Sequence, residues 1–173
     1  MNQKKLFVAL SVLIFIGIGI FFFRDGKTPT QDYKNISYQI EGENILLKNG
    51  LAEKESAPGS ASKTITRYFG NEVRGDFNND TKEDVAFLLT QSGGGSGLFY
   101  YIATALGKDG GYVGTNTIFI GDRIAPQTTE FRNGEIIVNY ADRKADESMA
   151  ETPSIGVSRY FIIQNNTLIE IKK

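Results

Sequence analysis

Side chains with oxygen ligands alternate along one short stretch of the chain, between a glycine and a continuous apolar run. Positions 1, 3, 5 and 9 of a D-x-N-x-D-x-x-x-D pattern are held by Asp76, Asn78, Asp80 and Asp84. In a tightly turned loop every second side chain can point inward, and carboxylate and amide oxygens are the ligands that hard cations prefer. The spacing therefore predicts a loop that binds a cation such as Ca²⁺.

The loop differs from an EF-hand in its flanking elements and in its key residues. An EF-hand loop needs Gly at position 6 and Glu at position 12, where this chain has Thr81 and Phe87. Strand-like segments flank the loop, which predicts a strand–loop–strand element. A second interpretation stays open: the same side chains form an Asx-rich turn that caps the strand ends without an ion, and the ammonium group of Lys82 relieves repulsion between the carboxylates.

The segment Gly75-Asp76-Phe77-Asn78, followed by Asp80 and Asp84, resembles the calcium loops of integrin-type FG-GAP and VCBS repeats. This resemblance implies a calcium site in which Lys82 contributes its backbone carbonyl. The chain departs from the pattern at Thr81, where those repeats favour glycine, and a positive φ is strained in a β-branched residue. The resemblance covers the loop alone, because the domain is too short for the four or more blades of a propeller.

The soluble part of the chain is also similar to a group of uncharacterised bacterial membrane-anchored or exported β-domain proteins. They share an acidic loop that is followed by a glycine-rich turn and an aromatic strand like Phe99-Tyr100-Tyr101. This similarity implies a bacterial context and points to no particular activity.

The absence of three residue types excludes several kinds of chemistry. The 173-residue chain has a formal net charge of -1 and contains no His, Cys or Trp. Imidazole bases, thiol nucleophiles and disulfides are therefore excluded, and zinc, copper, haem and iron–sulfur centres lack their usual ligands. Lys and Glu residues are interspersed and form no basic stripe, which argues against nucleic acid as a partner.

The N-terminal segment predicts a membrane anchor. Lys4 and Lys5 precede eighteen uncharged residues, Leu6–Phe23, and a helix of this length spans about 27 Å, close to the thickness of the bilayer hydrocarbon core. A cleavable signal peptide is the alternative, but the Phe21-Phe22-Phe23 end does not suit a cleavage site, which needs small residues. We therefore expect residues 1–24 to form an uncleaved, single-pass signal anchor in the cell membrane, with the C-terminal domain outside.

After a predicted polar tether over residues 25–34, residues 35–173 are predicted to form one compact, mostly β domain. Apolar runs separated by Gly, Asn and Asp predict antiparallel strands in a single sheet, sandwich-like or barrel-like arrangement. Residues 51–62 form a predicted loop with one helical turn over Leu51–Glu55. Asn133-Gly134 and Asn165-Asn166 mark two tight hairpins. The predicted strands are Ile36–Ile40, Ile45–Lys48, Thr64–Gly70, Asp84–Gln91, Leu98–Leu106, Tyr112–Ile120, Thr128–Arg132, Glu135–Tyr140, Val157–Gln164 and Thr167–Ile171.

Three further segments are candidates for recognition elements. The glycine-rich segment Ser92–Gly97 is predicted to be a flexible hairpin connection, because a phosphate loop needs a Lys-Ser/Thr pair and a following helix. Phe99–Tyr101 places aromatic rings on both faces of one strand, so that one face belongs to the core and the other either stacks a sugar or packs against an adjoining sheet or loop. The charged segment Asp142–Met149 is predicted to be a solvated connection, with recognition as the alternative.

These features together predict a membrane-anchored, extracytoplasmic binding or structural domain, with a structural Ca²⁺ ion held weakly in the acidic loop. The predicted partners are the lipid bilayer, through Leu6–Phe23, and an envelope protein or glycan. The alternatives are an accessory subunit of an envelope complex and a cell-envelope glycan hydrolase that uses paired carboxylates. The candidate carboxylates are Asp122, Glu130, Glu135, Asp142 and Glu147. A small β domain rarely offers the cleft that such chemistry needs, so the sequence does not favour an enzyme.

Overall fold

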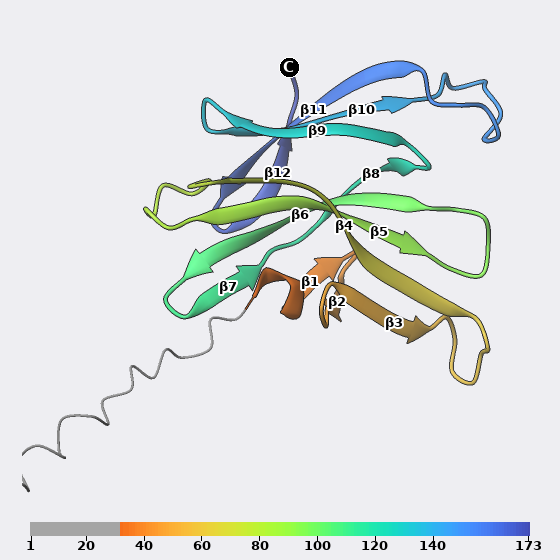
Figure 1. Ribbon diagram of the computed structural model, residues 1–173, viewed down its shortest axis with the longest axis horizontal. Coiled ribbons are helices and arrows are strands. Elements are labelled where there is room, and N and C mark those ends of the chain that lie inside the picture. Colours follow the sequence, from red (N-terminus) through yellow and green to blue (C-terminus); the bar gives the residue numbers. More distant parts are fainter. Residues whose placement is uncertain (1–31) are drawn as a thin grey trace, which may run out of the picture.

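The computed structural model describes residues 32–173, in which the regular structure is almost entirely antiparallel β-sheet (Figure 1). A short 3-10 turn, η2 (Tyr33–Asn35), precedes the strands, and this range contains no α-helix. The strands are β1 (Ser37–Ile40), β2 (Glu43–Leu46), β3 (Leu51–Glu55), β4 (Lys63–Gly75), β5 (Asp84–Ser92), β6 (Phe99–Lys108), β7 (Gly111–Gly114), β8 (Ile118–Asp122), β9 (Ala125–Arg132), β10 (Glu135–Asp142), β11 (Ile155–Gln164) and β12 (Thr167–Ile171). The predicted mostly β, antiparallel fold is confirmed.

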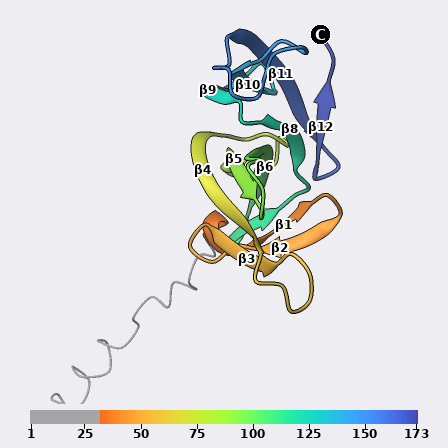
Figure 2. The same ribbon diagram turned by 90° about the vertical axis from the view of Figure 1, so that its right-hand side faces the viewer.

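Three sheets are stacked in layers (Figure 2). The middle sheet has the order β3-β4-β5-β6-β7, and β8 also pairs with β6. The hairpin β1-β2 covers one face of this sheet, and the four-stranded sheet β12-β11-β10-β9 lies over the other. The edge strands of the middle sheet, β3 and β7, do not pair with each other. The barrel-like alternative is therefore wrong, and the layered arrangement is closer to a sandwich with a third, smaller layer.

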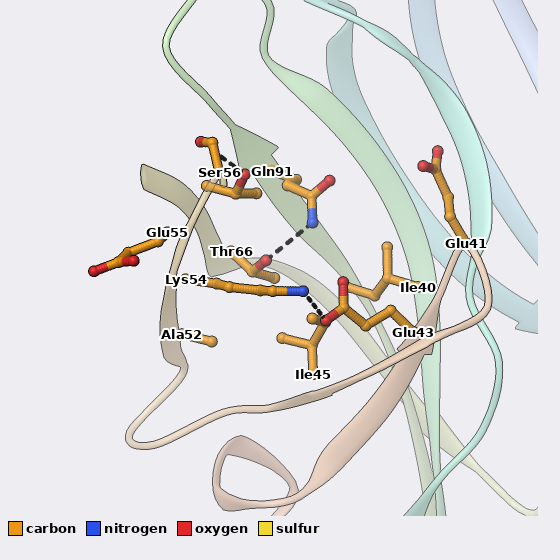
Figure 3. A pocket seen from close by; sticks show the side chains of 11 residues that line it. Ile40, Glu41, Glu43, Ile45, Ala52, Lys54, Glu55, Ser56, Thr66 and Gln91 are labelled. Atoms are coloured by element: carbon orange, nitrogen blue, oxygen red, sulfur yellow. Dashed lines mark hydrogen bonds and ion pairs between the residues drawn. The ribbon is translucent and has the colours of Figure 1, made fainter. Parts of the chain in front are cut away.

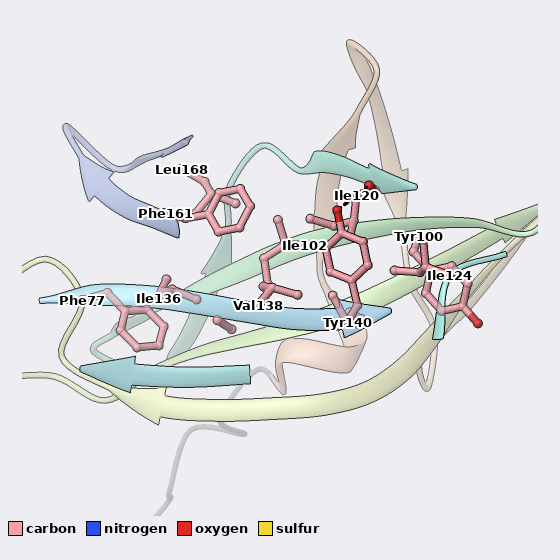
Figure 4. Packing of buried hydrophobic residues seen from close by; sticks show 12 residues of the cluster. Phe77, Tyr100, Ile102, Ile120, Ile124, Ile136, Val138, Tyr140, Phe161 and Leu168 are labelled. Atoms are coloured by element: carbon pink, nitrogen blue, oxygen red, sulfur yellow. Dashed lines mark hydrogen bonds between the residues drawn. The ribbon is translucent and has the colours of Figure 1, made fainter. Parts of the chain in front are cut away.

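Strands β5 and β6 are buried on both faces because they run through the centre of the stack. Along them Leu88 and Ile102 face the four-stranded sheet, whereas Phe87 and Leu89 face the hairpin. Burial on both sides explains why Val85–Leu89 is a continuous apolar run and not an alternating one. The first core, between the middle and four-stranded sheets, includes Phe77, Ile102, Ile136, Val138, Phe161 and Leu168 (Figure 4).

The second core lies between the middle sheet and the hairpin, and it is rich in aromatic rings. The ring of Phe87 lies 5.6 Å from that of Tyr33 and 5.5 Å from that of Tyr38, measured between centroids. Tyr33 is buried in this cluster although it belongs to the predicted tether. The folded domain therefore includes the last residues of the segment that was predicted to be a tether.

The segment Leu51–Glu55 is strand β3, so the prediction of a helical turn there was wrong. Leu51 pairs with Arg67 of β4, and the register continues to Glu55 and Lys63. An ion pair of 2.9 Å between Lys63 and Glu53 also joins the two strands. The pairing with β4 satisfies the backbone of this segment, and this cross-strand pairing overrides its local tendency.

The predicted strand Tyr112–Ile120 is divided into β7 and β8, which pair with successive parts of β6. Between them the chain turns aside toward Gln39 of β1. The amide of Gln39 donates to the carbonyl of Thr115 at 3.1 Å, and the amide of Thr117 donates to the carbonyl of Gln39 at 2.8 Å. The break in the strand thus ties the hairpin layer to the middle sheet.

Both predicted tight hairpins are confirmed. Asn133 and Gly134 have φ of 56° and 78°, and Asn165 and Asn166 have φ of 52° and 59°, as turns of type I′ require. The predicted anchor, Leu6–Phe23, lies outside the described residues. Within residues 32–173, no helix has the length and apolar character needed to cross a membrane.

Candidate functional site

The acidic loop joins β4 to β5 as a strand–loop–strand element, as predicted. The first of these strands was expected to end at Gly70, but β4 continues through a bulge to Gly75. Gly75 pairs directly with Asp84, the first residue of β5. The two ends of the loop are therefore held together by the strand ladder.

Oxygen atoms of the loop side chains converge on backbone amides of the same turn. Asp76 Oδ1 and Asn78 Oδ1 both accept a hydrogen bond from the amide of Asp80, each at 3.0 Å. Asp76 Oδ2 accepts from the amide of Thr81 at 2.8 Å. Asp80 Oδ1 accepts from the amide of Lys82 at 3.0 Å. The structure thus brings the side chains of positions 1, 3 and 5 together in overlapping Asx turns.

The turn requires left-handed backbone at two residues. Asn79 has φ of 60° and Thr81 has φ of 69°. The left-handed conformation at position 6 is thus held by a β-branched residue, at a cost of roughly 1–2 kcal/mol. The hydrogen bond from the Thr81 amide to Asp76 helps to hold this conformation.

Asp84, the fourth predicted ligand, has a different environment from the other three. Its side chain is fully buried, Oδ2 accepts from the amide of Phe77 at 2.9 Å, and Oδ1 accepts from the amide of Gly107 at 2.8 Å. Burial raises the pKa of Asp84, and the two amide hydrogen bonds oppose that rise. A Cβ atom at Gly107 would lie 2.4 Å from the carbonyl oxygen of Glu83, so only glycine allows this approach. Asp84 therefore ties the loop to the end of β6.

Two lysines bring positive charge to the edge of the loop. Lys108 Nζ donates to Asp80 Oδ2 at 3.1 Å, and Lys82 Nζ donates to Asp109 Oδ1 at 2.6 Å. The hydrogen bond from Lys108 lowers the pKa of Asp80. Lys82, which was expected to relieve repulsion inside the loop, pairs with a carboxylate outside it, and Lys108 takes the role inside.

The donor atoms of the loop are all oxygen, which suits a hard cation. Among residues 32–173, however, no group of three or more Asp, Glu, His or Cys side chains is arranged to hold a metal ion. The structure groups Asp76, Asn78 and Asp80, sets Asp84 apart, and brings the amide of Lys82 into the turn. The calcium site stays a prediction.

The carboxylates that were considered for a hydrolase are distributed over several elements. Glu135 and Asp142 stand at opposite ends of β10, and Glu135 pairs with Lys173 at 2.7 Å. A hydrogen bond from Arg123 lowers the pKa of Asp122, and one from the amide of Lys144 lowers that of Glu147. A general acid needs the opposite shift. The pKa shifts of Asp122 and Glu147 are therefore opposite to the shift that a general acid needs.

A cavity of about 270 Å³ opens between the hairpin β1-β2 and strands β3 and β4 (Figure 3). An ion pair between Lys54 of β3 and Glu43 of β2 bridges it, as Figure 3 shows. Deeper in the cavity the side-chain amide of Gln91 donates to Thr66 Oγ1 at 3.3 Å. The lysine of this cavity is thus already paired with a carboxylate of the protein.

A second cavity, of about 260 Å³, shares two lining residues with the first, Glu41 and Gln91. Its other walls are Phe99, Tyr101 and Phe119. The sequence singled out the aromatic strand Phe99–Tyr101 but missed Glu41 and Phe119. The Glu41-Gly42 pair is a hairpin signal that could have placed Glu41 at a turn, whereas no local pattern brings Phe119 to this place.

Comparisons of the chain with protein-family models, with curated proteins and with solved structures gave no match.

Proposed function

We propose that this protein is a membrane-anchored, extracytoplasmic binding domain whose acidic loop is stabilised by a structural Ca²⁺ ion. The observation that carries the proposal is the convergence of Asp76 Oδ1 and Asn78 Oδ1 on the amide of Asp80. Two oxygen ligands of the predicted set are thereby held close together by the backbone of the loop. The carboxylate of Asp80 lies beside them, bonded to the side-chain amide of Asn78 at 3.1 Å.

The role proposed for the ion is to stabilise the connection between β4 and β5. A calcium ion neutralises Asp76 and Asp80 and takes over the role of the Lys108 ammonium group, which pairs with Asp80 at 3.1 Å. Calcium loops of extracellular modules bind with dissociation constants on the order of 10⁻⁴ to 10⁻³ M, which suits a calcium-rich exterior. The support for the membrane anchor is the uncharged segment Leu6–Phe23 that follows Lys4 and Lys5.

Thermal unfolding of the full chain tests the ion. The protein is kept in a polyoxyethylene ether detergent, and its midpoint is compared in calcium and in chelator. At about ten times the dissociation constant, bound calcium stabilises by roughly 1.4 kcal/mol, which raises the midpoint by about 3 °C. Asp80→Ala should lose this rise, whereas Asp109→Ala, which removes a carboxylate just outside the loop, should keep it. Identical wild-type midpoints in calcium and chelator would overturn the proposed ion.

Labelling of a single introduced cysteine tests the location. Because the chain contains no Cys, Ala61→Cys in the exposed connection between β3 and β4 gives one thiol. We expect a membrane-impermeant maleimide to label this thiol on intact cells. Labelling that requires lysis would place the domain inside and contradict the proposal.

A further inference from the structure

An aromatic hollow lies at the end of β6 that is opposite the acidic loop. Tyr101 of β6 pairs directly with Phe119 of β8, and Phe99 lies on the same face two residues earlier. The Phe119 ring lies 6.3 Å from the Phe99 ring and 5.6 Å from the Tyr101 ring between centroids, and the ring planes are tilted by 54° and 63°. Rings at these angles form an uneven surface, whereas stacking of a sugar is favoured by a flat platform.

Two of the three aromatic side chains of the hollow are partly open to solvent. Phe99 is 37% exposed and Phe119 is 45% exposed, whereas Tyr101 below them is buried. Exposure of two adjacent phenylalanines leaves apolar surface in contact with water in a concave place, which is where small ligands bind.

A carboxylate from the hairpin layer completes the hollow. Tyr101 Oη donates to Glu41 Oε1 at 2.9 Å, although the two residues are 60 positions apart in the chain. The other carboxylate oxygen of Glu41 has no hydrogen bond or ion pair within residues 32–173. The residues that line the hollow include no lysine or arginine. The hollow therefore carries a negative charge that the protein does not neutralise there.

The backbone at Glu41 indicates that the turn itself does not demand glutamate. Glu41 has φ of 51° at the first position of its hairpin turn, a left-handed conformation that Asn and Gly adopt more readily. Other turns of this chain place Asn at this conformation: Asn49, Asn133 and Asn165 have φ of 51°, 56° and 52°. The strain at Glu41 therefore accompanies a side chain that acts outside the turn.

We propose that this hollow binds a small organic cation, such as a quaternary or methylated ammonium group. A weakly hydrated cation is attracted to the exposed rings of Phe99 and Phe119, and the Glu41 carboxylate, held by the buried Tyr101, balances its charge. The proposal gives a ligand class to the binding role proposed above and rests on that role. It does not need the calcium ion, because the acidic loop lies at the other end of β5 and β6.

Titration of the full chain with choline and tetramethylammonium tests the proposal. The polyoxyethylene ether detergent carries neither an ammonium group nor a sugar, so it does not compete. The reference probe is the neutral isostere of choline in which a tert-butyl group replaces the trimethylammonium group. We expect calorimetry to show that choline binds at least about ten-fold more tightly than this isostere. Equal affinity for both probes, or no binding of choline, would contradict the proposal.

Two variants test whether choline binding depends on the Glu41 carboxylate. Glu41→Gln keeps a hydrogen-bond acceptor for Tyr101 and should weaken choline binding about ten-fold. Glu43→Gln, a neutralised carboxylate on the same hairpin that pairs with Lys54 in the other cavity, should leave choline binding unchanged. The thermal midpoint of each variant shows that it is folded. A Glu41→Gln variant that is folded and binds choline as the wild type does would overturn the proposal.

Two further measurements distinguish this proposal from the calcium proposal and from glycan binding. Choline affinity should be the same in calcium and in chelator. The calcium proposal and the choline proposal can therefore fail independently of each other. Glucose and N-acetylglucosamine should cause no heat. Binding of either sugar that is insensitive to Glu41→Gln, without binding of choline, would replace the organic cation with a glycan.

Discussion

Carboxylates lie at both ends of the strand pair β5 and β6, and their oxygen atoms have different hydrogen-bond partners at the two ends. At the acidic loop, Asp76 and Asp84 each accept two backbone amides, so their oxygens are used to shape the chain. At the aromatic end, Glu41 accepts a single hydrogen bond, from Tyr101, and lies on a cavity. Asp76 and Asp84 therefore stabilise the fold through the backbone, whereas Glu41 holds no backbone group of residues 32–173 in place.

This difference indicates where each kind of ligand belongs. The acidic loop offers closely spaced oxygens in a polar turn, which suits a compact inorganic cation. The aromatic hollow offers ring faces and one charge, which suits a bulky cation that sheds its water easily. The same central strands thus present two sites of different chemistry.

The largest expected effect is at Asp84. Asp84→Ala leaves the amides of Phe77 and Gly107 buried without their acceptor, and each unpaired group costs about 1–3 kcal/mol. We expect the free energy of unfolding in urea to fall by about 3–5 kcal/mol. Glu41→Ala, the matched change at the other end, removes one part-buried hydrogen bond and should cost about 1 kcal/mol. Equal losses in the two variants would show that Glu41 supports the fold as much as Asp84 does.

The next largest effect is expected at Gly107, whose amide reaches Asp84. A Cβ there would lie 2.4 Å from the Glu83 carbonyl oxygen, so Gly107→Ala forces the strand end away from the carboxylate. Overpacking of this kind costs about 1–3 kcal/mol, which urea unfolding will measure. The control is Gly156→Ala in β11, where no atom lies within 4 Å of the added Cβ. The account predicts a change below about 0.5 kcal/mol for the control.

A smaller effect of opposite sign is expected at Thr81. Thr81→Gly relieves the left-handed strain, by roughly 1–2 kcal/mol, and loses part of that gain to the greater chain entropy of glycine. The net result should be a rise of about 0.5 kcal/mol in the free energy of unfolding and tighter calcium binding. Thr64→Gly, at an ordinary position of β4, should instead destabilise the protein. If Thr81→Gly lowers the free energy of unfolding as much as Thr64→Gly does, the turn is not strained.

The smallest effect is a difference in titration within the acidic loop of the calcium-free protein. The pKa of Asp80 is lowered by Lys108, so its contribution to stability is present above the pKa of an unfolded Asp and is lost as the pH falls through the lower folded value. The pKa of Asp84 is raised by burial, so its contribution is present at low pH and is lost as the pH rises through the raised value. Carboxyl-carbon NMR should find Asp84 titrating at higher pH than Asp80. Lys108→Gln should raise the pKa of Asp80 and leave that of Asp84 in place, although the hydrogen bonds from the Lys82 amide and the Asn78 side chain still lower the pKa of Asp80. The reverse order of titration would contradict these environments.

The parts of the molecule that could be predicted from sequence are those fixed by local patterns. The Asn133-Gly134 pair specifies its own turn, and the run Val85–Leu89 is apolar enough to indicate burial on both faces. The spacing of Asp76, Asn78 and Asp80 predicts side chains that point into one tight turn, as the structure shows. These features depend on residues that are neighbours in the chain.

The parts that could not be predicted depend on distant partners. Leu51–Glu55 is a strand because it pairs with β4. The chain leaves the sheet between β7 and β8 because Gln39 forms backbone hydrogen bonds with Thr115 and Thr117. The aromatic hollow joins Glu41, Tyr101 and Phe119 from three elements, and neither spacing nor composition relates them. Only the folded arrangement of layers brings these side chains to one place.

Amide NMR spectra of the full chain test whether the two ends of β5 and β6 are separate binding sites. The spectra are recorded in chelator, in calcium and in choline. We expect calcium to shift the amide resonances of Asp80, Thr81 and Lys82 and to leave those of Glu41 and Tyr101 unchanged. Choline should shift the second set and leave the first. Calcium that moves neither set, or a single ligand that moves both sets equally, would contradict the division of the domain into two sites.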